Sequence, residues 1–109
     1  MSTNYKLVRD RIPQIIKNTG KQPITKILDN DEYIMELKNK IYEELEEYVE
    51  TYNDQDAIEE LADLLEVIIS LARCHGSSFE MLEEVRRMKE VNRGGFKEKI
   101  YLIQVDDMK

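Results

Sequence analysis

The sequence predicts an all-α fold, an antiparallel helical bundle, with a small two-stranded β element added to it. Apolar residues recur every three or four positions through most of the chain, which is the period of a helix that packs on one face. Residues that begin and end helices separate these periodic stretches, and only two short segments resemble strands. At 109 residues the chain has room for one modest core, so we expect a single domain over residues 1–109.

The first half of the chain is expected to hold a short helix, an extended segment and a long helix. The short helix covers IPQIIKNTG, with Pro13 in its first turn and Gly20 at its end. Residues 24–28 contain several β-branched residues and predict a strand. The long helix begins at one of the candidate caps in residues 29–31 and ends near Asn53. Its apolar stripe consists of Ile34, Leu37, Ile41, Leu45, Tyr48 and Tyr52.

The next predicted helix runs from Gln55 to about His75 and has two neighbouring apolar faces. The first face consists of Ile58, Leu61, Leu65, Ile69 and Ala72. The second face consists of Leu64, Val67, Ile68 and Leu71. One short bundle cannot easily cover both, so we expect the first face in the core of the chain and the second in a homodimer or higher oligomer.

A shorter helix is predicted from Ser78 to about Asn92, with Ser77 and Glu80 as a capping box. Gly94 and Gly95 end it. The following KEKIYLIQV is typical of a strand. Because a strand needs a partner, we expect residues 98–104 to pair with residues 24–28.

The negative charge of the chain is concentrated in one stretch. The net charge is −7, and residues 43–63 alone carry ten acids and no base. This balance argues against a nucleic-acid partner bound through net charge. The chain has no apolar run long enough for a membrane span, no secretory h-region and only one cysteine, so we expect a cytoplasmic protein without a membrane partner. The acidic stretch is either a solvated surface or a cation site.

Two pairs of carboxylates within this stretch have the spacing of a metal site. Glu44 and Glu47 are three residues apart, as are Glu60 and Asp63, so each pair lies on one face of its helix. The short connection between the helices makes them antiparallel neighbours, which lets all four groups converge. Oxygen ligands of this kind suit Mg²⁺, with Mn²⁺ as a second candidate. The alternative is an ordinary acidic helix surface.

The order of motifs resembles the all-α nucleoside triphosphate pyrophosphatases, which include MazG-like proteins and phosphoribosyl-ATP pyrophosphohydrolase. The stretches KIYEELEE, EELADLLEVI and KEVNRGGF carry the resemblance, and YKLVRDRIPQII is similar to a phosphoribosyl-ATP pyrophosphohydrolase-like subgroup. The family signature is Glu-x-x-Glu followed by Glu-x-x-Asp. The family often has a small residue inside the first motif, whereas this chain has Leu45 and Glu46, which leaves Glu43 and Glu44 as alternative first ligands.

The resemblance implies a Mg²⁺-dependent nucleotide pyrophosphohydrolase that cleaves the α–β phosphate bond, giving a monophosphate and pyrophosphate. It implies that Glu44, Glu47, Glu60 and Asp63 hold the metal. Glu47 is the preferred acceptor of the proton from water, with Glu44 as its catalytic companion. We expect the substrate phosphates to be bound by Lys89 and Arg93 and, in a second basic block, by Lys6 and Arg9. The alternative function is a non-catalytic helical dimerisation or regulatory module on the same fold.

Overall fold

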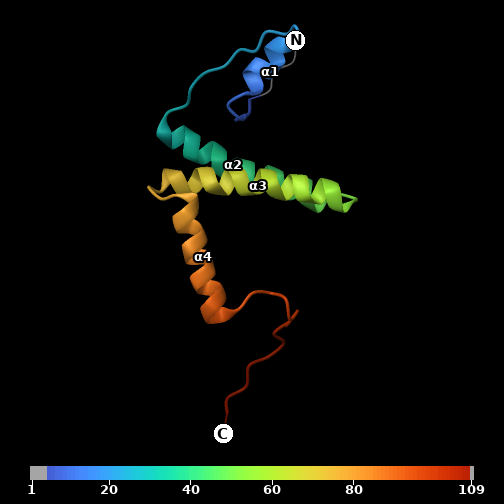
Figure 1. The fold of residues 1–109 in the computed structure, drawn as a ribbon, viewed down its shortest axis with the longest axis vertical. Helices are drawn as coiled ribbons and strands as arrows, with labels where there is room; N and C mark the ends of the chain where they lie inside the picture. Colours follow the sequence, from blue (N-terminus) through green and yellow to red (C-terminus); the bar gives the residue numbers. More distant parts are fainter. Residues whose placement is uncertain (1–4, 109) are drawn as a thin grey trace.

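Helices dominate the structure, a computed structural model that describes residues 5–108. Within that range the chain forms α1 (Ile12–Asn18), α2 (Asn30–Val49), α3 (Asp54–Cys74) and α4 (Phe79–Arg93). Figure 1 shows α2 and α3 side by side as an antiparallel hairpin, with α1 beyond one side of it and α4 leading away from the far end of α3. No helix in the described part is long and apolar enough to cross a membrane.

Polar side chains set the starts of the three longer helices. The side chain of Asp29 accepts a hydrogen bond from the backbone N–H of Glu32 at 2.8 Å, which identifies the cap among the three candidates. Asn53 caps α3 in the same way at 2.8 Å. The cap of α4 is Ser78, which accepts from Met81 at 3.1 Å. The prediction that Ser77 caps this helix is therefore wrong by one residue.

The predicted two-stranded β element is absent from the described residues. Residues 24–28 form an extended linker between α1 and α2, and residues 98–104 form an extended segment after α4. Figure 1 shows these segments on opposite sides of the hairpin, with α4 leading the second away from it. Both segments contain β-branched residues, but a two-stranded sheet forms only when two backbones lie within hydrogen-bonding reach of each other. Here neither segment has the other beside it.

The core of the chain lies between α2 and α3. Leu37 on α2 is 4% exposed and Val67 on α3 is 9% exposed, the lowest values among the apolar residues described. Because Val67 belongs to the second apolar face of its helix, that face is the one that packs inward. Ile58, Leu61 and Leu65 of the first face are exposed instead. The predicted assignment of the two faces is therefore reversed.

The reversal has a simple physical origin. Both faces of α3 are comparably apolar, so helical periodicity alone could not decide which one turns toward α2. A similar shift occurs on α2, where the inward row consists of buried Leu37 with half-buried Ile41 and Tyr48, whereas the predicted stripe member Leu45 is exposed. The inward position near the end of this row is occupied by Glu44. The packing of the hairpin thus carries carboxylates inward.

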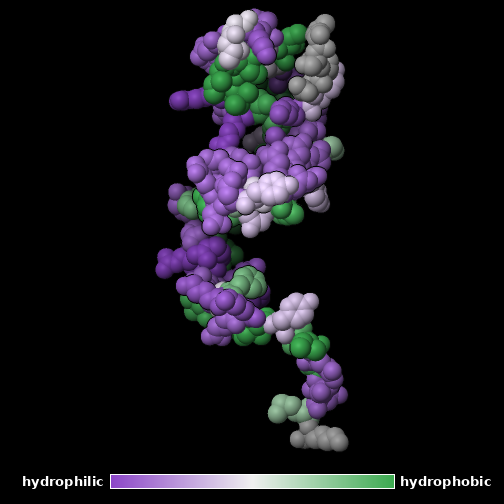
Figure 2. All heavy atoms as spheres, turned by 90° about the vertical axis from the view of Figure 1, so that its right-hand side faces the viewer, coloured by the Kyte–Doolittle hydropathy of each residue, from purple (hydrophilic) through white to green (hydrophobic). Residues whose placement is uncertain are grey.

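The chain is elongated for its length. Its radius of gyration is 19.1 Å, with principal extents of 71 × 36 × 22 Å, compared with about 13 Å for a compact chain of this length. Among the helices, α2 packs on α3, and α3 packs on α4. Figure 2 looks at the molecule from the side of the α2–α3 turn and shows mainly hydrophilic residues over that end of the hairpin. The single chain therefore has one small helical core and large exposed surfaces.

Candidate metal centre

Three glutamates converge near the closed end of the α2–α3 hairpin. Glu44 and Glu47 lie one helical turn apart on α2, and Glu60 lies near the start of α3. One carboxylate oxygen from each can be chosen so that all three lie within 4.8 Å of one another. The short connection at residues 50–53 makes this possible, because it places the end of α2 beside the beginning of α3. Three of the four carboxylates that were expected to converge therefore lie together.

Two of these carboxylates have oxygens without a partner. Glu44 is buried, with 9% of its surface exposed. Its Oε2 and the Oε2 of Glu60 are inaccessible and have no hydrogen-bond partner among the described residues. A buried carboxylate oxygen without a donor is costly, because water no longer solvates its charge. The pair is therefore suited to receive a cation.

The electrostatics of the cluster follow from this crowding. Burial, reinforced by the charge of Glu47, raises the pKa of Glu44 from 4.5 to about 7. Burial and the neighbouring Glu47 also raise the pKa of Glu60. The charge of Asp63 acts on both groups in the same direction. A divalent cation would remove this repulsion by neutralising the charges that cause it.

Lys40 is the lysine nearest to the buried glutamate, and sequence reasoning had missed it. Its Nζ lies 3.9 Å from Oε1 of Glu44 and 3.2 Å from Oε2 of Glu43. The signal was present in the sequence, since Lys40 stands three and four residues before these acids. Glu43 is exposed and directed to this lysine, whereas Glu44 joins the cluster. The arrangement favours Glu44 over Glu43 as the first ligand.

Asp63, the fourth predicted acid, is paired with Arg9 and is not among the carboxylates that lie within 4.8 Å of one another. Nη2 of Arg9 donates a hydrogen bond to Oδ1 of Asp63 at 2.6 Å. The two side chains are 58% and 42% exposed, so solvent screens the pair. This contact connects the segment before α1 to the hairpin. Two residues with different predicted roles, phosphate binding for Arg9 and metal binding for Asp63, thus bind each other.

The other predicted phosphate ligands do not approach the cluster within one chain. Lys89 and Arg93 are exposed near the end of α4. Figure 1 shows that α4 departs from the end of the hairpin opposite the α2–α3 turn. Lys6 is exposed in the segment before α1. Of the basic residues predicted to bind phosphate, only Arg9 has a described contact with one of the four acids.

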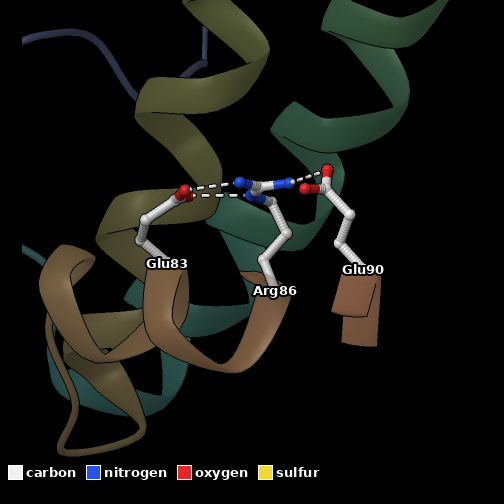
Figure 3. Close-up of polar contacts among 3 residues, drawn as sticks. All are labelled: Glu83, Arg86 and Glu90. Carbon is white, nitrogen blue, oxygen red and sulfur yellow. Dashed lines mark hydrogen bonds and ion pairs between the residues drawn. The ribbon is translucent and has the colours of Figure 1, made fainter. Parts of the chain in front are cut away.

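A second charged cluster lies on α4, and its geometry is that of a surface network. Arg86 donates two hydrogen bonds to Glu83, at 2.6 and 2.9 Å, and one to Glu90 at 3.2 Å (Figure 3). The hydrogen bonds from Arg86 lower the pKa of Glu83. The spacing of three and four residues along the helix is the one at which such contacts form. All charges in this network have partners, so it offers no vacant ligand.

The residues of the glutamate cluster fit a hard divalent cation. They supply oxygen donors only, which suits Mg²⁺ or Mn²⁺ better than a metal that prefers nitrogen or sulfur. The two unpartnered oxygens of Glu44 and Glu60 are the structural feature that a cation would satisfy. Glu47 is exposed and can face solvent. A site of this kind leaves positions for water and for a phosphate ligand.

Comparison with known proteins adds one short similarity. Over 41 residues the chain is 46% identical to an uncharacterized protein of Mycolicibacterium smegmatis, a match that covers 38% of this chain and 42% of that protein. No family model matches the chain. No solved structure matches it either.

Proposed function

We propose that the protein is a divalent-metal-dependent nucleotide pyrophosphohydrolase that cleaves the bond between the α- and β-phosphates. The products would be a nucleoside monophosphate and pyrophosphate. The single observation that carries the proposal is the convergence of three glutamates, two of which have buried oxygens without a partner. The motif resemblance described above agrees with this reading. The proposal includes a cytoplasmic location, because the sequence has one cysteine and so no internal disulfide that would need an oxidising compartment.

Each glutamate has a role that follows from its exposure. Glu44 and Glu60 are the natural metal holders, because their unpartnered oxygens need a positive charge. When bound there, Mg²⁺ would neutralise phosphate charge and make a water bound to it more acidic. Glu47 is exposed, so a water can approach its carboxylate and lose a proton to it. Asp63 lies close enough to raise the pKa values of Glu44 and Glu60 and serves as a fourth acid.

Arg9 is the best-placed cation for the substrate phosphates in the same chain. Its guanidinium already binds a carboxylate at the site, and the same planar group binds phosphate oxygens in pairs. A phosphate would compete with Asp63 for Arg9 and so release Asp63 toward the metal. Lys6 precedes Arg9 in the same segment. Lys89 and Arg93 remain in the proposal for an assembly in which α4 of one chain approaches the hairpin of another.

The proposed active form is a homodimer or higher oligomer. The surface that supports it is the outer face of the hairpin, which we define as the exposed apolar residues of α2 and α3 that point away from the core. These residues are Met35, Tyr42, Leu45, Val49, Ile58, Leu61 and Leu65. Apolar surface of this extent at helical spacing marks an interaction surface. The oligomer can be tested by sedimentation, where a stable monomer at micromolar concentration would contradict it.

A non-catalytic dimerisation module is the second candidate function. The observation that favours it is the ion pair between Arg9 and Asp63, which occupies the fourth acid of the proposed site. Such a module would keep the helical hairpin and its outer face without any turnover. The two candidates differ in whether the protein releases pyrophosphate.

The test is a screen of nucleoside triphosphates for pyrophosphate release with Mg²⁺. We expect turnover of at least one nucleotide, lost by at least 100-fold in Glu60→Gln. Glu59→Gln is the matched control, because Glu59 is the adjacent exposed acid and should leave turnover within about twofold. No pyrophosphate release from any nucleotide would favour the non-catalytic module. Equal losses in the two variants would contradict the assignment of Glu60.

A further inference from the structure

The last part of the chain exposes an unusual amount of apolar surface. We define the arm as residues 96–105, which follow α4 and form no helix or strand. Figure 2 shows its hydrophobic residues in a thin segment that stands clear of the helices. Its large apolar residues are all at least 74% exposed: Phe96, Ile100, Tyr101, Leu102, Ile103 and Val105. Apolar surface of this kind marks a segment that binds another surface.

The outer face of the hairpin has the length and the chemistry to receive the arm. An extended segment of ten residues spans at most about 33–36 Å. A helix of twenty residues, the length of α2, spans about 30 Å. The exposed outer face runs from Met35 to Val49 on α2, about 21 Å of that helix, and from Ile58 to Leu65 on α3. The arm is therefore long enough to cross the outer face and matches it in polarity.

The charges that flank these two surfaces are complementary. Residues 43–63, which form the closed end of the hairpin, hold ten acids and no base. Residues 86–99, which comprise the second half of α4 and the start of the arm, hold six bases and two acids. Figure 1 shows that within one chain α4 leaves from the end of the hairpin opposite the acidic end and leads the basic segment away from the hairpin. Two copies with hairpins running in opposite directions would bring each basic segment toward the acidic end of the other.

We propose that two copies of this chain exchange their arms, so that the arm of each copy packs on the outer face of the other copy's hairpin. The arm exchange rests on the oligomer of the proposed function and identifies the contact that would hold its two copies together. Exchange of a terminal segment is a common route to a dimer, because the same contacts serve both copies. Gly94, at φ 81°, sets the direction in which the chain leaves α4, and Lys99, at φ 59°, turns the chain again within the arm.

The first test compares oligomeric state by sedimentation. The wild-type protein should sediment at twice the chain mass of 12.9 kDa. The variant Ile100→Ser/Leu102→Ser removes two side chains from one side of the extended arm, and should raise the dimer dissociation constant at least tenfold. The control Met88→Ser/Val91→Ser removes two exposed apolar side chains from α4 instead and should leave the dimer unchanged. All variants should keep wild-type helical circular dichroism.

The outcomes separate the arm exchange from the oligomer itself. If the arm variant dimerises as tightly as the wild type, the exchange is wrong while the oligomer stands. If the wild type is monomeric, both are wrong.

The second test is disulfide capture between two chains of different mass, in a Cys74→Ser background. One chain carries Leu102→Cys in the arm and the other Leu61→Cys on the outer face. We expect a mixed disulfide dimer at least ten times faster than with Val91→Cys as the second chain. Equal rates would overturn the proposal, as would ready capture within one chain that carries both Leu102→Cys and Leu61→Cys.

Discussion

The α2–α3 hairpin and the part of the chain after it differ in how far contacts within one chain bury their residues. In the hairpin, both helices have side-chain caps and share the buried residues Leu37 and Val67. By contrast, α4 contains no buried residue, and the arm is exposed throughout. Helix α4 has a cap and internal ion pairs, which are local interactions. Local interactions can form a helix, but burial against other elements is what fixes its place in a fold.

The largest difference between the two regions should appear on truncating an apolar residue in each. Leu37→Ala removes the most buried apolar side chain of the hairpin and should lower the free energy of unfolding by about 2–5 kcal/mol. Val91→Ala on α4 should change it by less than about 0.5 kcal/mol, because that side chain is exposed. Urea unfolding followed by circular dichroism measures both. Similar losses would mean that α4 belongs to the same buried core.

The buried carboxylate should make the metal-free hairpin less stable as pH rises. The pKa of Glu44 is raised from 4.5 to about 7 by its burial and by Glu47. The folded state therefore binds a proton at Glu44 more tightly than the unfolded state does, so the contribution of this group to stability is greatest below pH 4.5 and declines up to about pH 7. The change in the pKa of Glu44 from 4.5 to about 7 corresponds to at most about 3 kcal/mol in the free energy of unfolding.

Glu44→Gln should therefore stabilise the metal-free protein at pH 8 and flatten this part of the pH profile. Urea unfolding at pH 5 and pH 8, with a chelator present, gives the comparison. Glu50→Gln, at an exposed acid that follows the last residue of α2 and lies outside the cluster, is the control and should retain the wild-type profile. A Glu44→Gln variant that loses stability at pH 8 would show that the carboxylate is well compensated in the metal-free fold.

A smaller effect is expected from the contact between the N-terminal segment and the hairpin. Arg9→Ala removes the 2.6 Å ion pair with Asp63, yet global stability should fall by less than about 1 kcal/mol because the pair is exposed. The effect of Arg9→Ala should be local: the backbone amides of α1 should exchange hydrogen faster in the variant than in the wild type. Hydrogen exchange detected by mass spectrometry measures this. Unchanged exchange in α1 would mean that other contacts hold the segment.

The smallest effect should come from the ion pairs of α4. Arg86→Ala breaks the contacts with Glu83 and Glu90 shown in Figure 3. Each exposed pair at this spacing contributes about 0.3–0.5 kcal/mol, so the total change should stay below about 1 kcal/mol. High salt should make the variant and the wild type converge, because it screens the same interactions. A loss of several kcal/mol would contradict the description of α4 as locally stabilised.

The sequence was a good guide wherever a local interaction decides the outcome. The helices and most of their limits follow from side-chain caps, such as Asp29 and Asn53, and from apolar spacing. The grouping of Glu44, Glu47 and Glu60 also follows, because the three-residue spacing and the short connection at residues 50–53 leave few other arrangements. These features depend on neighbours within a turn or two along the chain.

Apart from the one-residue error at the cap of α4, where Ser78 and not Ser77 is the cap, the predictions that failed depend on partners distant in the sequence. Residues 24–28 and 98–104 have strand-like composition, but nothing local shows that α4 carries the second away from the first. The rotation of α3 could not be chosen from two similar apolar faces, and so Val67 was assigned to the wrong surface. Arg9 and Asp63 are 54 residues apart in the sequence, and no local spacing pattern predicts that they pair. Such contacts are set by tertiary packing.

The central claim is that Glu44, Glu47 and Glu60 hold a divalent cation. The most direct test is the melting temperature of the protein with and without millimolar Mg²⁺, measured for the wild type, Glu60→Gln and Glu59→Gln. Mg²⁺ should raise the melting temperature of the wild type and of Glu59→Gln, because a ligand that binds only the folded state stabilises it. Glu60→Gln should show no such rise. A wild-type melting temperature that Mg²⁺ leaves unchanged, or an undiminished rise in Glu60→Gln, would contradict the claim.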